Sequence, residues 1–564
     1  MRTSILAAVA VLLAACSAPP PPPPIPAAKP APAVAHFDWF AYEGHDPVYD
    51  TVKAGAHDTL NPILPGFYPD PSIVRTGADY YLVNSTFAYF PGLPIFHSRD
   101  LVHWTQIGNA IDRPTQVDFK GLEMSRGLFA PAISIHNGTY YIVNTCVDCA
   151  GNFLITATNP AGPWSDPVQL GFEGIDPSLF FDAGGKAYIV NNGLPEGTPL
   201  YNGHRAIWMQ EFDAAAKKMV GPRRVIVNAG TDIRKKPIWI EGPHLFRARG
   251  WYYLICAEGG TAEQHSEVVF RSKSVWGPYV PYKANPILTQ RDLDPKRTFP
   301  VTSTGHAQFV ATPKGQWFAV FLGTRPYSDD LYNTGRETFM LPVTWKNGWP
   351  VILQKAKPVP YALKRPAEAS DASPVQSGNF AWREEFDAPL GPQWLFVRTP
   401  HEKWYEIGGS SLSLTARPES IGGTGQPSFL GRRQQHGWAS VSTAMRFAPQ
   451  IDGERAGLVA FQNSNFFYFL GLVRENGKTS VCVTKRAGAA DPEDGAVQTC
   501  QPVETSTIDL KIESRGGAYD FSYATTPGQW TVLVRDADGT ILSTKKAGGF
   551  VGTVIGAYAY KQAQ

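Results

Sequence analysis

The sequence predicts an all-β protein: a five-bladed β-propeller followed by a β-sandwich. Three observations support this fold class. First, glycine, proline and aromatic residues are plentiful (53 Gly, 49 Pro, 15 Trp, 23 Tyr and 31 Phe in 564 residues), which suits short strands joined by turns. Second, an aromatic strand introduced by glycine returns five times between residues 60 and 350. Third, the last third of the chain alternates apolar and polar residues without helical periodicity. A chain of this length is expected to form at least two large domains.

The first sixteen residues are predicted to be a lipoprotein signal peptide. Arg2 supplies the positive start, residues 5–13 form an apolar core, and Leu13-Ala14-Ala15-Cys16 resembles a bacterial lipoprotein cleavage box. The apolar run is too short to cross a bilayer permanently. We therefore expect an exported protein whose only membrane attachment is a lipid on Cys16. Ser17 at the next position favours the outer membrane, facing either the periplasm or the cell surface. The alternative is an ordinary signal peptide with an incidental Cys16.

The remaining chain divides into four predicted parts. Residues 17–36 are a Pro/Ala tether of polyproline character. Residues 37–360 are the predicted propeller, 361–378 a polar linker rich in Pro, Ser and Ala, and 379–564 the predicted sandwich. The formal net charge of +2 gives no reason to propose nucleic acid or an anionic membrane surface as a partner.

Two pairs of cysteines are candidate disulfides in an exported protein. Cys146 and Cys149 form a CVDC motif, and Cys482 and Cys500 flank a predicted hairpin. No second ligand pair lies near the first, so the sequence does not indicate a zinc site. Cys256 falls in an apolar run and is expected to be a buried thiol.

The repeat between residues 60 and 350 indicates five blades. The second aromatic residue of each glycine-introduced strand recurs at intervals of about 47 to 65 residues, at Tyr81, Tyr141, Tyr188, Tyr253 and Phe318. A β unit of that size with several strands is typical of a propeller blade.

Counting back from these aromatic residues identifies one blade position with unusual chemistry. Eleven or twelve residues earlier in each blade stand Asp70, Ala130, Asp176, Glu241 and His306. Equivalent positions on innermost strands surround the propeller axis, so three acids and a histidine are expected to share one funnel. Each residue alone has a plainer explanation: an Asp beside Pro or Gly often forms a turn, and Glu241 could pair with a nearby cation. Three carboxylates in register favour a functional role, because clustering like charges costs free energy.

Such a cluster has the groups that glycoside hydrolysis needs. One ionised carboxylate activates water and one protonated carboxyl group donates to the leaving oxygen. Neighbouring negative charge raises the pKa of the donor. Aromatic residues around the funnel would stack on sugar faces, although most aromatic residues of the chain are expected to pack between strands. The candidates for stacking are Phe87, Tyr89, Phe90 and Phe129.

Long motifs in this region resemble glycoside hydrolase family 43, the five-bladed propeller enzymes that include β-xylosidases and α-L-arabinofuranosidases. The matching segments are NPILPGFYPDPSI (61–73), NSTFAYFPGLPIFHSRDLVHW (84–104), GIDPSLFFD (174–182), EGPHLF (241–246), STGHAQFV (303–310) and TGRETFMLPVTW (334–345). The resemblance implies that Asp70 is the general base, Asp176 the residue that tunes pKa and orients, and Glu241 the general acid.

The resemblance also implies a sugar pocket and a mechanism. His306 and Arg336 would bind the terminal sugar, with Phe87 in its wall. Many relatives have Trp-Ala-Pro where this chain has Phe129-Ala130-Pro131, so the shape of the pocket near Phe129 is expected to differ. The family inverts the anomeric centre, which implies that Asp70 and Glu241 stand roughly 6.5–9.5 Å apart with a water between them.

No cofactor is required by the implied reaction, and no metal ligands are assigned. In part of the family the histidine on the axis contacts calcium, so calcium near His306 is possible. Arg336 has an alternative reading as a structural partner of the adjacent Glu337.

Segments of the C-terminal region resemble the concanavalin-like domain of family 43 β-xylosidases. They are FAWREEFDAPLGPQW (380–394), SFLGRRQQH (428–436) and GLVAFQNSNFFYFLGL (457–472). In such enzymes a loop of this domain closes one side of the pocket, often with a Phe, and Phe550 is the candidate here. A closed pocket implies action on chain ends. The alternative is a sandwich that only stabilises the protein or binds polysaccharide, with Phe550 in its core.

The leading hypothesis is an inverting, exo-acting β-xylosidase that releases xylose from xylo-oligosaccharides. An α-L-arabinofuranosidase would use the same catalytic residues on arabino-oligosaccharides. An endo-acting arabinanase or xylanase would need an open groove. In a different class, a surface lipoprotein with an inactive site would only bind sugars, and retention of all three acids argues against it.

Overall fold

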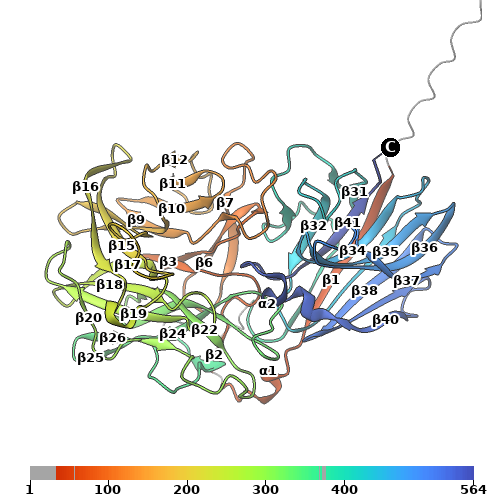
Figure 1. Ribbon diagram of the computed structural model, residues 1–564. Coiled ribbons are helices and arrows are strands. Elements are labelled where there is room, and N and C mark those ends of the chain that lie inside the picture. The colour runs from red at the N-terminus through yellow and green to blue at the C-terminus, as the bar shows by residue number, and fades with distance from the viewer. Residues whose placement is uncertain (1–32, 56, 368, 371–375, 564) are drawn as a thin grey trace, which may run out of the picture. The chain divides into compact units, whose positions relative to one another are not determined.

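The propeller consists of five small antiparallel sheets that follow one another along the chain (Figure 1). The computed structural model describes residues 33–563, with the exception of residues 56, 368 and 371–375. Blade 1 contains β3 (Ser72–Thr76), β4 (Asp79–Val83), β6 (Gly92–Ser98) and β7 (Thr105–Ile111). Blade 2 contains β8 (Gly127–Leu128), β9 (Ala132–His136), β10 (Thr139–Val147), β11 (Gly151–Ala157) and β12 (Val168–Gln169).

The other three blades repeat this meander. Blade 3 contains β13 (Ile175–Phe181), β14 (Ala187–Gly193), β15 (Ala206–Asp213) and β16 (Lys218–Asn228). Blade 4 contains β17 (Glu241–Ala248), β18 (Trp251–Glu258), β19 (Ser266–Ser272), β20 (Val280–Pro281) and β21 (Leu288–Thr289). Blade 5 contains β22 (Thr302–Ala311), β23 (Trp317–Thr324) and β24 (Glu337–Pro342). The predicted five-bladed propeller is confirmed.

Apolar side chains between neighbouring blades hold the ring together. Leu82 and Phe96 of blade 1 share one buried cluster with Val320 and Met340 of blade 5, so the last blade packs on the first and closes the ring. Similar clusters join blades 2 and 3, 3 and 4, and 4 and 5. Burying one such side chain fully contributes roughly 1.5–3 kcal/mol, which makes blade packing the main support of the axis.

The sandwich consists of two eight-stranded sheets. One contains, in spatial order, β30 (Tyr405–Ile407), β31 (Leu412–Thr415), β1 (Val34–Gly44), β33 (Trp438–Arg446), β38 (Thr507–Arg515), β39 (Ala518–Ala524) and β40 (Thr531–Asp538), with β28 (Phe380–Glu384) paired to β1. The other contains β37 (Ala496–Pro502), β36 (Lys478–Ala487), β35 (Phe466–Glu475), β34 (Arg455–Asn463), β41 (Val554–Tyr560), β32 (Ser428–Arg433), β29 (Leu395–Val397) and β5 (Tyr89–Phe90). The predicted sandwich is confirmed.

The first described strand lies in the sandwich and not in the propeller. Residues 37–44 were expected to open the propeller and residues 34–36 to end the tether, yet all of them form β1, which pairs with β33, β28 and β31. The pairing of Phe40 with Thr443 joins residues about four hundred positions apart. The alternating pattern of HFDWFAYEG indicates a strand, but the pattern does not say which sheet the strand joins. The expected boundaries near residue 37 are therefore wrong.

The expected linker at 361–378 also contains structure. Its strand β27 (Ala362–Lys364) pairs with β2 (Asp58–Leu60), beside the start of blade 1. A further hairpin follows blade 5, formed by β25 (Thr344–Lys346) and β26 (Trp349–Val351). Helical turns in the described chain are short: α1 (Val48–Thr51), η1 (Ile233–Lys235), η2 (Gly539–Leu542) and α2 (Thr544–Ala547).

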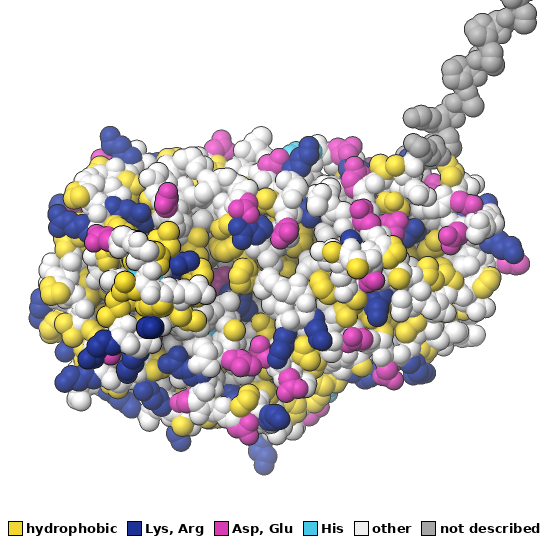
Figure 2. Space-filling model, in the orientation of Figure 1, with side chains coloured by type: hydrophobic (Ala, Val, Ile, Leu, Met, Phe, Trp, Pro, Cys, Tyr) yellow, Lys and Arg dark blue, Asp and Glu magenta, His cyan; other side chains and the backbone are white. Residues whose placement is uncertain are grey.

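Cysteine pairing follows the sequence prediction. Cys146 is bonded to Cys149 and Cys482 to Cys500, while Cys256 is a buried free thiol. Acidic and basic side chains are both spread over the face seen in Figure 2, as a formal net charge of +2 suggests. Within the part of the chain that the structure describes, no helix is long and apolar enough to cross a membrane. The predicted signal peptide, Cys16 and nearly all of the tether lie outside the described residues.

Candidate active site

The five blade positions found by counting meet in one pocket. Asp70, Ala130, Asp176, Glu241 and His306 all line a cavity of about 420 Å³. The other predicted site residues, Phe87, Phe129, Arg336 and Phe550, line it as well. The structure therefore brings together the three acids and all the sugar-binding residues that the resemblance implies. Two of the four stacking candidates, Tyr89 and Phe90, do not line this cavity, because they form β5 and pair with β29 of the sandwich.

In blades 3, 4 and 5 a break in strand pairing lies at this position. The register of the innermost strand shifts between Ile175 and Ser178 in blade 3, between Glu241 and His244 in blade 4, and around His306 in blade 5. A bulge of this kind leaves a residue out of the ladder and re-aims its side chain. Asp70, Asp176 and His306 have φ angles of 51°, 53° and 54°. Left-handed backbone is unfavourable for non-glycine residues and is found preferentially at functional sites.

Asp70 is a buried carboxylate surrounded by cations and donors. Arg336 donates from Nη1 to Oδ1 at 3.1 Å and from Nη2 to Oδ2 at 3.4 Å, and the Ser85 hydroxyl donates to Oδ2 at 2.6 Å. His306 Nδ1 lies 3.7 Å from Oδ1. Burial by itself would raise the pKa of Asp70, but Arg336, His306 and the Ser85 hydrogen bond outweigh it and lower the pKa below its ordinary value. Asp70 is therefore ionised.

The pKa values of Asp176 and Glu241 are raised, in contrast to that of Asp70. Burial, followed by the charges of Glu241 and Asp70, raises the pKa of Asp176 well above its ordinary value. Asp176 Oδ2 accepts a hydrogen bond of 3.3 Å from the Gly242 N–H, which ties it to the strand that carries Glu241. Burial and the charge of Asp70 raise the pKa of Glu241 to about 7. One pocket thus holds an ionised carboxylate and a carboxyl group that keeps its proton near neutral pH.

His306 is a buried side chain packed against a glycine. Burial lowers its pKa, with Arg336 adding to the effect and Asp70 opposing it. A Cβ on Gly242, whose φ is 55°, would come within 2.8 Å of the imidazole. The glycine that follows Glu241 therefore makes room for His306 on the axis.

Arg336 binds Asp70 and not Glu337. The Glu337 carboxylate instead accepts from the Arg325 guanidinium at 2.6 and 2.8 Å, close to Asp46. The alternative reading of Arg336 as a structural partner of Glu337 is therefore wrong. Arg336 also donates to Thr261 Oγ1 at 3.0 Å.

Three phenylalanines form one wall of the pocket. The ring of Phe550 stacks on Phe87 at a centroid distance of 5.7 Å and meets Phe129 edge-on at 5.8 Å. The Phe550 N–H donates to the Ser125 hydroxyl at 2.8 Å, which fastens the sandwich segment to the propeller. Phe550 lies between η2–α2 and β41 of the sandwich, so the second domain supplies part of the pocket.

Sequence reasoning missed several residues of the pocket. Trp239 and Arg126 line it, together with Ile175, Gly260 and Thr261. Trp239 stands two residues before Glu241, so its closeness to the acid in the sequence could have identified it. The centre of its ring lies 4.0 Å from the Arg205 guanidinium. Arg126 and Thr261 lie in loops without a distinctive pattern, so only the fold reveals them.

Among the described residues, no group of three or more His, Cys, Asp or Glu is arranged to hold a metal ion. Calcium near His306 therefore stays a prediction.

Comparisons with known proteins agree with this geometry. Residues 59–350 match the model of glycosyl hydrolases family 43, and residues 383–564 match the β-xylosidase C-terminal concanavalin A-like domain. A xylosidase/arabinosidase of Butyrivibrio fibrisolvens is 38% identical over 88% of this chain and 95% of its own. A non-reducing end α-L-arabinofuranosidase of Bacteroides ovatus is 35% identical over 88% of this chain and 90% of its own.

A solved structure shares the whole architecture. A family 43 protein from a capybara gut metagenome is 40% identical, with a TM-score of 0.87 over 94% of this chain and all of its own. The ring of blades, the clustered carboxyl groups and both domain matches lead to one conclusion: this chain belongs to glycoside hydrolase family 43 and is a glycosidase with a C-terminal concanavalin-like domain.

Proposed function

We propose that this glycosidase is an inverting, exo-acting β-xylosidase that releases xylose from the non-reducing ends of xylo-oligosaccharides. The observation that carries the proposal is the contrast between two carboxyl groups in one pocket. The pKa of Asp70 is lowered by its cationic neighbours, and that of Glu241 is raised to about 7. Relatives named xylosidase/arabinosidase and β-xylosidase support the choice of sugar.

In the proposed reaction Asp70 acts as base and Glu241 as acid. Asp70 takes a proton from a water as the water oxygen bonds to the anomeric carbon. The bond from that carbon to the leaving oxygen breaks, and Glu241 gives this oxygen its proton. Asp176 holds its place through the Gly242 N–H, while burial and the charge of Asp70 keep Glu241 protonated. A separation of roughly 6.5–9.5 Å between the two carboxyl groups remains the prediction for an inverting site.

Arg336 and His306 are proposed to bind hydroxyls of the terminal sugar. Arg336 keeps Asp70 ionised with one edge of its guanidinium and lines the cavity. Phe87, Phe129 and Phe550 offer ring faces and edges to the sugar. No step of this scheme needs a metal ion, and a calcium ion near His306 would act on the binding of the sugar.

An α-L-arabinofuranosidase is the second candidate. The observation in its favour is the similarity to the arabinofuranosidase of Bacteroides ovatus. Two other readings fit less well. An endo-acting enzyme would need a groove open at both ends, and here Phe550 and its contact with Ser125 stand on one side of the pocket. A binding protein with an inactive site would have no use for two carboxyl groups held in different protonation states.

Removal of the Phe550 ring should weaken substrate binding. In Phe550→Ala, Phe87 and Phe129 lose an aromatic partner and the pocket opens on the sandwich side. We expect KM for xylobiose to rise about tenfold with a smaller change in kcat, because an aromatic contact is worth about 0.5–1.5 kcal/mol beyond its buried area. Phe466→Ala, a half-buried phenylalanine of the sandwich outside the pocket lining, is the matched control. An unchanged KM in Phe550→Ala would show that the ring does not contact substrate.

The function is tested by substrate preference and by stereochemistry. Initial rates are measured with p-nitrophenyl β-D-xylopyranoside, p-nitrophenyl α-L-arabinofuranoside and xylobiose, and ¹H NMR follows the first sugar released. We expect the β-xyloside to be preferred and α-xylose to appear first. Initial release of β-xylose would overturn inversion, and a preference for the arabinofuranoside would select the second candidate. Cleavage inside long xylan chains would contradict exo-action.

We also propose that the protein is exported and anchored by a lipid on Cys16, in the outer membrane. The support is the cleavage box at residues 13–16 and the Pro/Ala run that follows it. Cys16→Ala should move the protein from the membrane fraction to the soluble fraction. Equal partitioning of the two forms would contradict a lipid anchor.

A further inference from the structure

The pocket has a deep part and a mouth, which differ in exposure. Asp70, His306 and Arg336 are only 4%, 6% and 7% exposed. Trp239 is 36% exposed and the side chain of Arg126 39% exposed. If the terminal sugar fills the deep part, as the proposed function requires, the next sugar unit lies at the level of these mouth residues. That unit is the leaving group.

Arg126 is held at the mouth by a single hydrogen-bonded ion pair. Its Nε donates to Asp148 Oδ2 at 2.6 Å. Within the described residues, no hydrogen bond is recorded for Nη1 or Nη2. A guanidinium is planar and rigid, so fixing Nε sets the direction of both Nη groups. Arg126 therefore has donors available beside a sugar-binding pocket.

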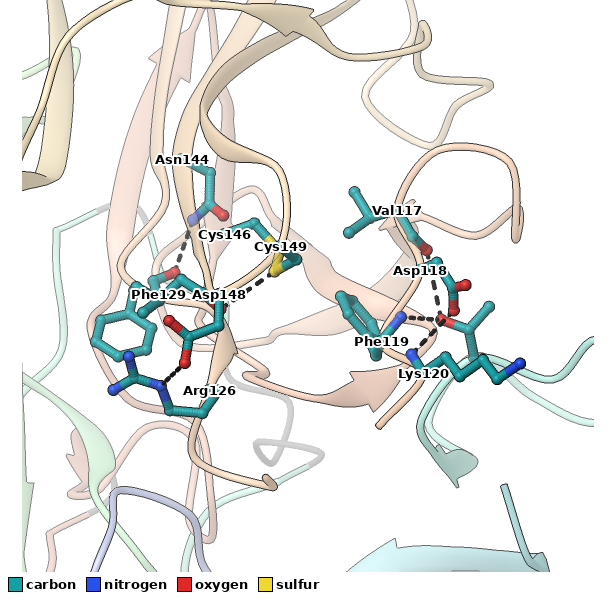
Figure 3. The surroundings of a disulfide bond; sticks show 12 residues. Val117, Asp118, Phe119, Lys120, Arg126, Phe129, Asn144, Cys146, Asp148 and Cys149 are labelled. Atoms are coloured by element: carbon teal, nitrogen blue, oxygen red, sulfur yellow. Dashed lines mark hydrogen bonds and ion pairs between the residues drawn. A yellow bond between two sulfur atoms is a disulfide. The ribbon is translucent and has the colours of Figure 1, made fainter. Parts of the chain in front are cut away.

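Asp148 is fixed in turn by the Cys146–Cys149 disulfide. The bonded cysteines bracket the turn between β10 and β11, in which Asp148 has a φ of 61° (Figure 3). Cys146 is fully buried and anchors the turn in blade 2. An exposed ion pair is normally weak because two long side chains lose freedom when they pair. Here the disulfide confines the backbone of one partner, which lowers that cost.

The same strand fixes the segment that carries Arg126. The Phe129 N–H donates to the Thr145 carbonyl at 3.0 Å, and the Asn144 side chain donates to the Phe129 carbonyl at 2.7 Å. On the other side, Ser125 accepts the hydrogen bond from Phe550. Residues 125–129 are thus held between the disulfide turn and the sandwich, and Figure 3 shows Arg126, Phe129 and Asp148 around that turn.

We propose that Arg126 binds hydroxyls of the leaving-group sugar, and that Asp148, in the Cys146–Cys149 turn, is its positioning residue. The proposal rests on the proposed function. It assigns the Cys146–Cys149 disulfide a role in substrate selection: without the bonded turn, Asp148 no longer fixes Arg126, and the enzyme loses its preference for a sugar as leaving group. The stability of variants that lack only Arg126 or Asp148 should change little, because an exposed ion pair contributes only about 0–1 kcal/mol.

The test compares two substrates that share the terminal sugar. Xylobiose has a second sugar unit, and β-D-xylopyranosyl fluoride has none. In Arg126→Ala we expect kcat/KM for xylobiose to fall about tenfold to hundredfold, because hydrogen bonds from a charged donor are lost. The fluoride should be hydrolysed within about threefold of the wild-type rate, since no leaving sugar is present to be bound. Turnover of both substrates by the wild type tests the proposed function separately.

Three further variants test positioning. Asp148→Asn keeps a residue that tolerates positive φ and removes the charge, so KM for xylobiose should rise while kcat/KM for the fluoride stays unchanged. Cys149→Ser should give the same selective loss, and Arg126→Ala with Asp148→Asn should be no worse than Arg126→Ala alone. Asp166→Asn, which removes one of the two carboxylate partners of Arg113 outside the pocket lining, is the matched control. Equal losses on both substrates in Arg126→Ala, or none on either, would overturn the proposal.

Discussion

Replacement of Asp70 by Asn should lower kcat on xylobiose by about 10⁴-fold, the upper end of what a general base contributes. The amide has the same shape as the carboxylate but cannot take a proton from water. Its effect should appear in kcat, because the base acts only on the attacking water. The rate is measured over hours by quantifying released xylose.

The same variant should change two further properties. Arg336 and His306 lose their buried anion, so stability falls, by about 3–5 kcal/mol where a buried ion pair is broken. Circular dichroism must therefore show that the variant is folded at the assay temperature. The pKa of Glu241 should fall, because the charge of Asp70 helps to raise it. Asp79→Asn, in a half-buried pair with His97 outside the pocket lining, controls for the loss of an Asp. A folded Asp70→Asn enzyme that keeps a tenth of its activity would exclude Asp70 as base.

Replacement of Glu241 by Gln should lower kcat on xylobiose by about 10³-fold. It should hardly affect the hydrolysis of substrates whose leaving group departs without a proton. Xylose is a poor leaving group and needs the acid, whereas 2,4-dinitrophenolate does not. We expect 2,4-dinitrophenyl β-D-xylopyranoside to be hydrolysed within about tenfold of the wild-type rate. Equal losses on both substrates would contradict a role as proton donor.

The pH dependence of Glu241→Gln provides an independent check. Burial and Asp70 raise the pKa of Glu241 to about 7, so the wild-type acid is protonated below that pH and loses its proton as the pH rises through it. Wild-type kcat/KM should therefore decline above pH 7, and this alkaline limb should be absent in Glu241→Gln. The pKa of Asp70 is lowered, so its protonation stops the reaction only below the ordinary range of an aspartate. Initial rates from pH 4 to 9 should therefore show the alkaline limb in the wild type and no acid limb.

Equivalent residues of the five blades can be found by their spacing in the sequence, because a propeller is a repeat closed on its own axis. Each blade is a local meander, so a fixed offset from an aromatic strand residue reaches the same structural position in every blade. Asp70, Asp176, Glu241 and His306 were found in this way and line one pocket. The offset could not show that Asp70, Asp176 and His306 have positive φ angles, because backbone strain depends on contacts from neighbouring blades.

Other features escaped the sequence because they depend on partners distant in the chain. The strand β1 has a clear alternating pattern, but only the sheet formed with β33 places it in the sandwich. Arg126 has no pattern of its own and reaches the pocket through the turn at Asp148. Phe550 was chosen from a resemblance between domains, and its position beside Phe87 depends on how the sandwich meets the propeller.

The sequence by itself determined the fold class, the five blades and the identity of the three acids, since each is recorded in a local pattern or a repeat. It named the two cysteine pairs as candidates, and the structure shows both as disulfides. Only the tertiary structure decided which acid is ionised. Asp70 owes its lowered pKa to Arg336, 266 residues later in the chain, and Glu241 owes its raised pKa to burial and to Asp70. A pKa is set by the charges and the solvent within a few ångströms of the group, and folding alone brings those neighbours together.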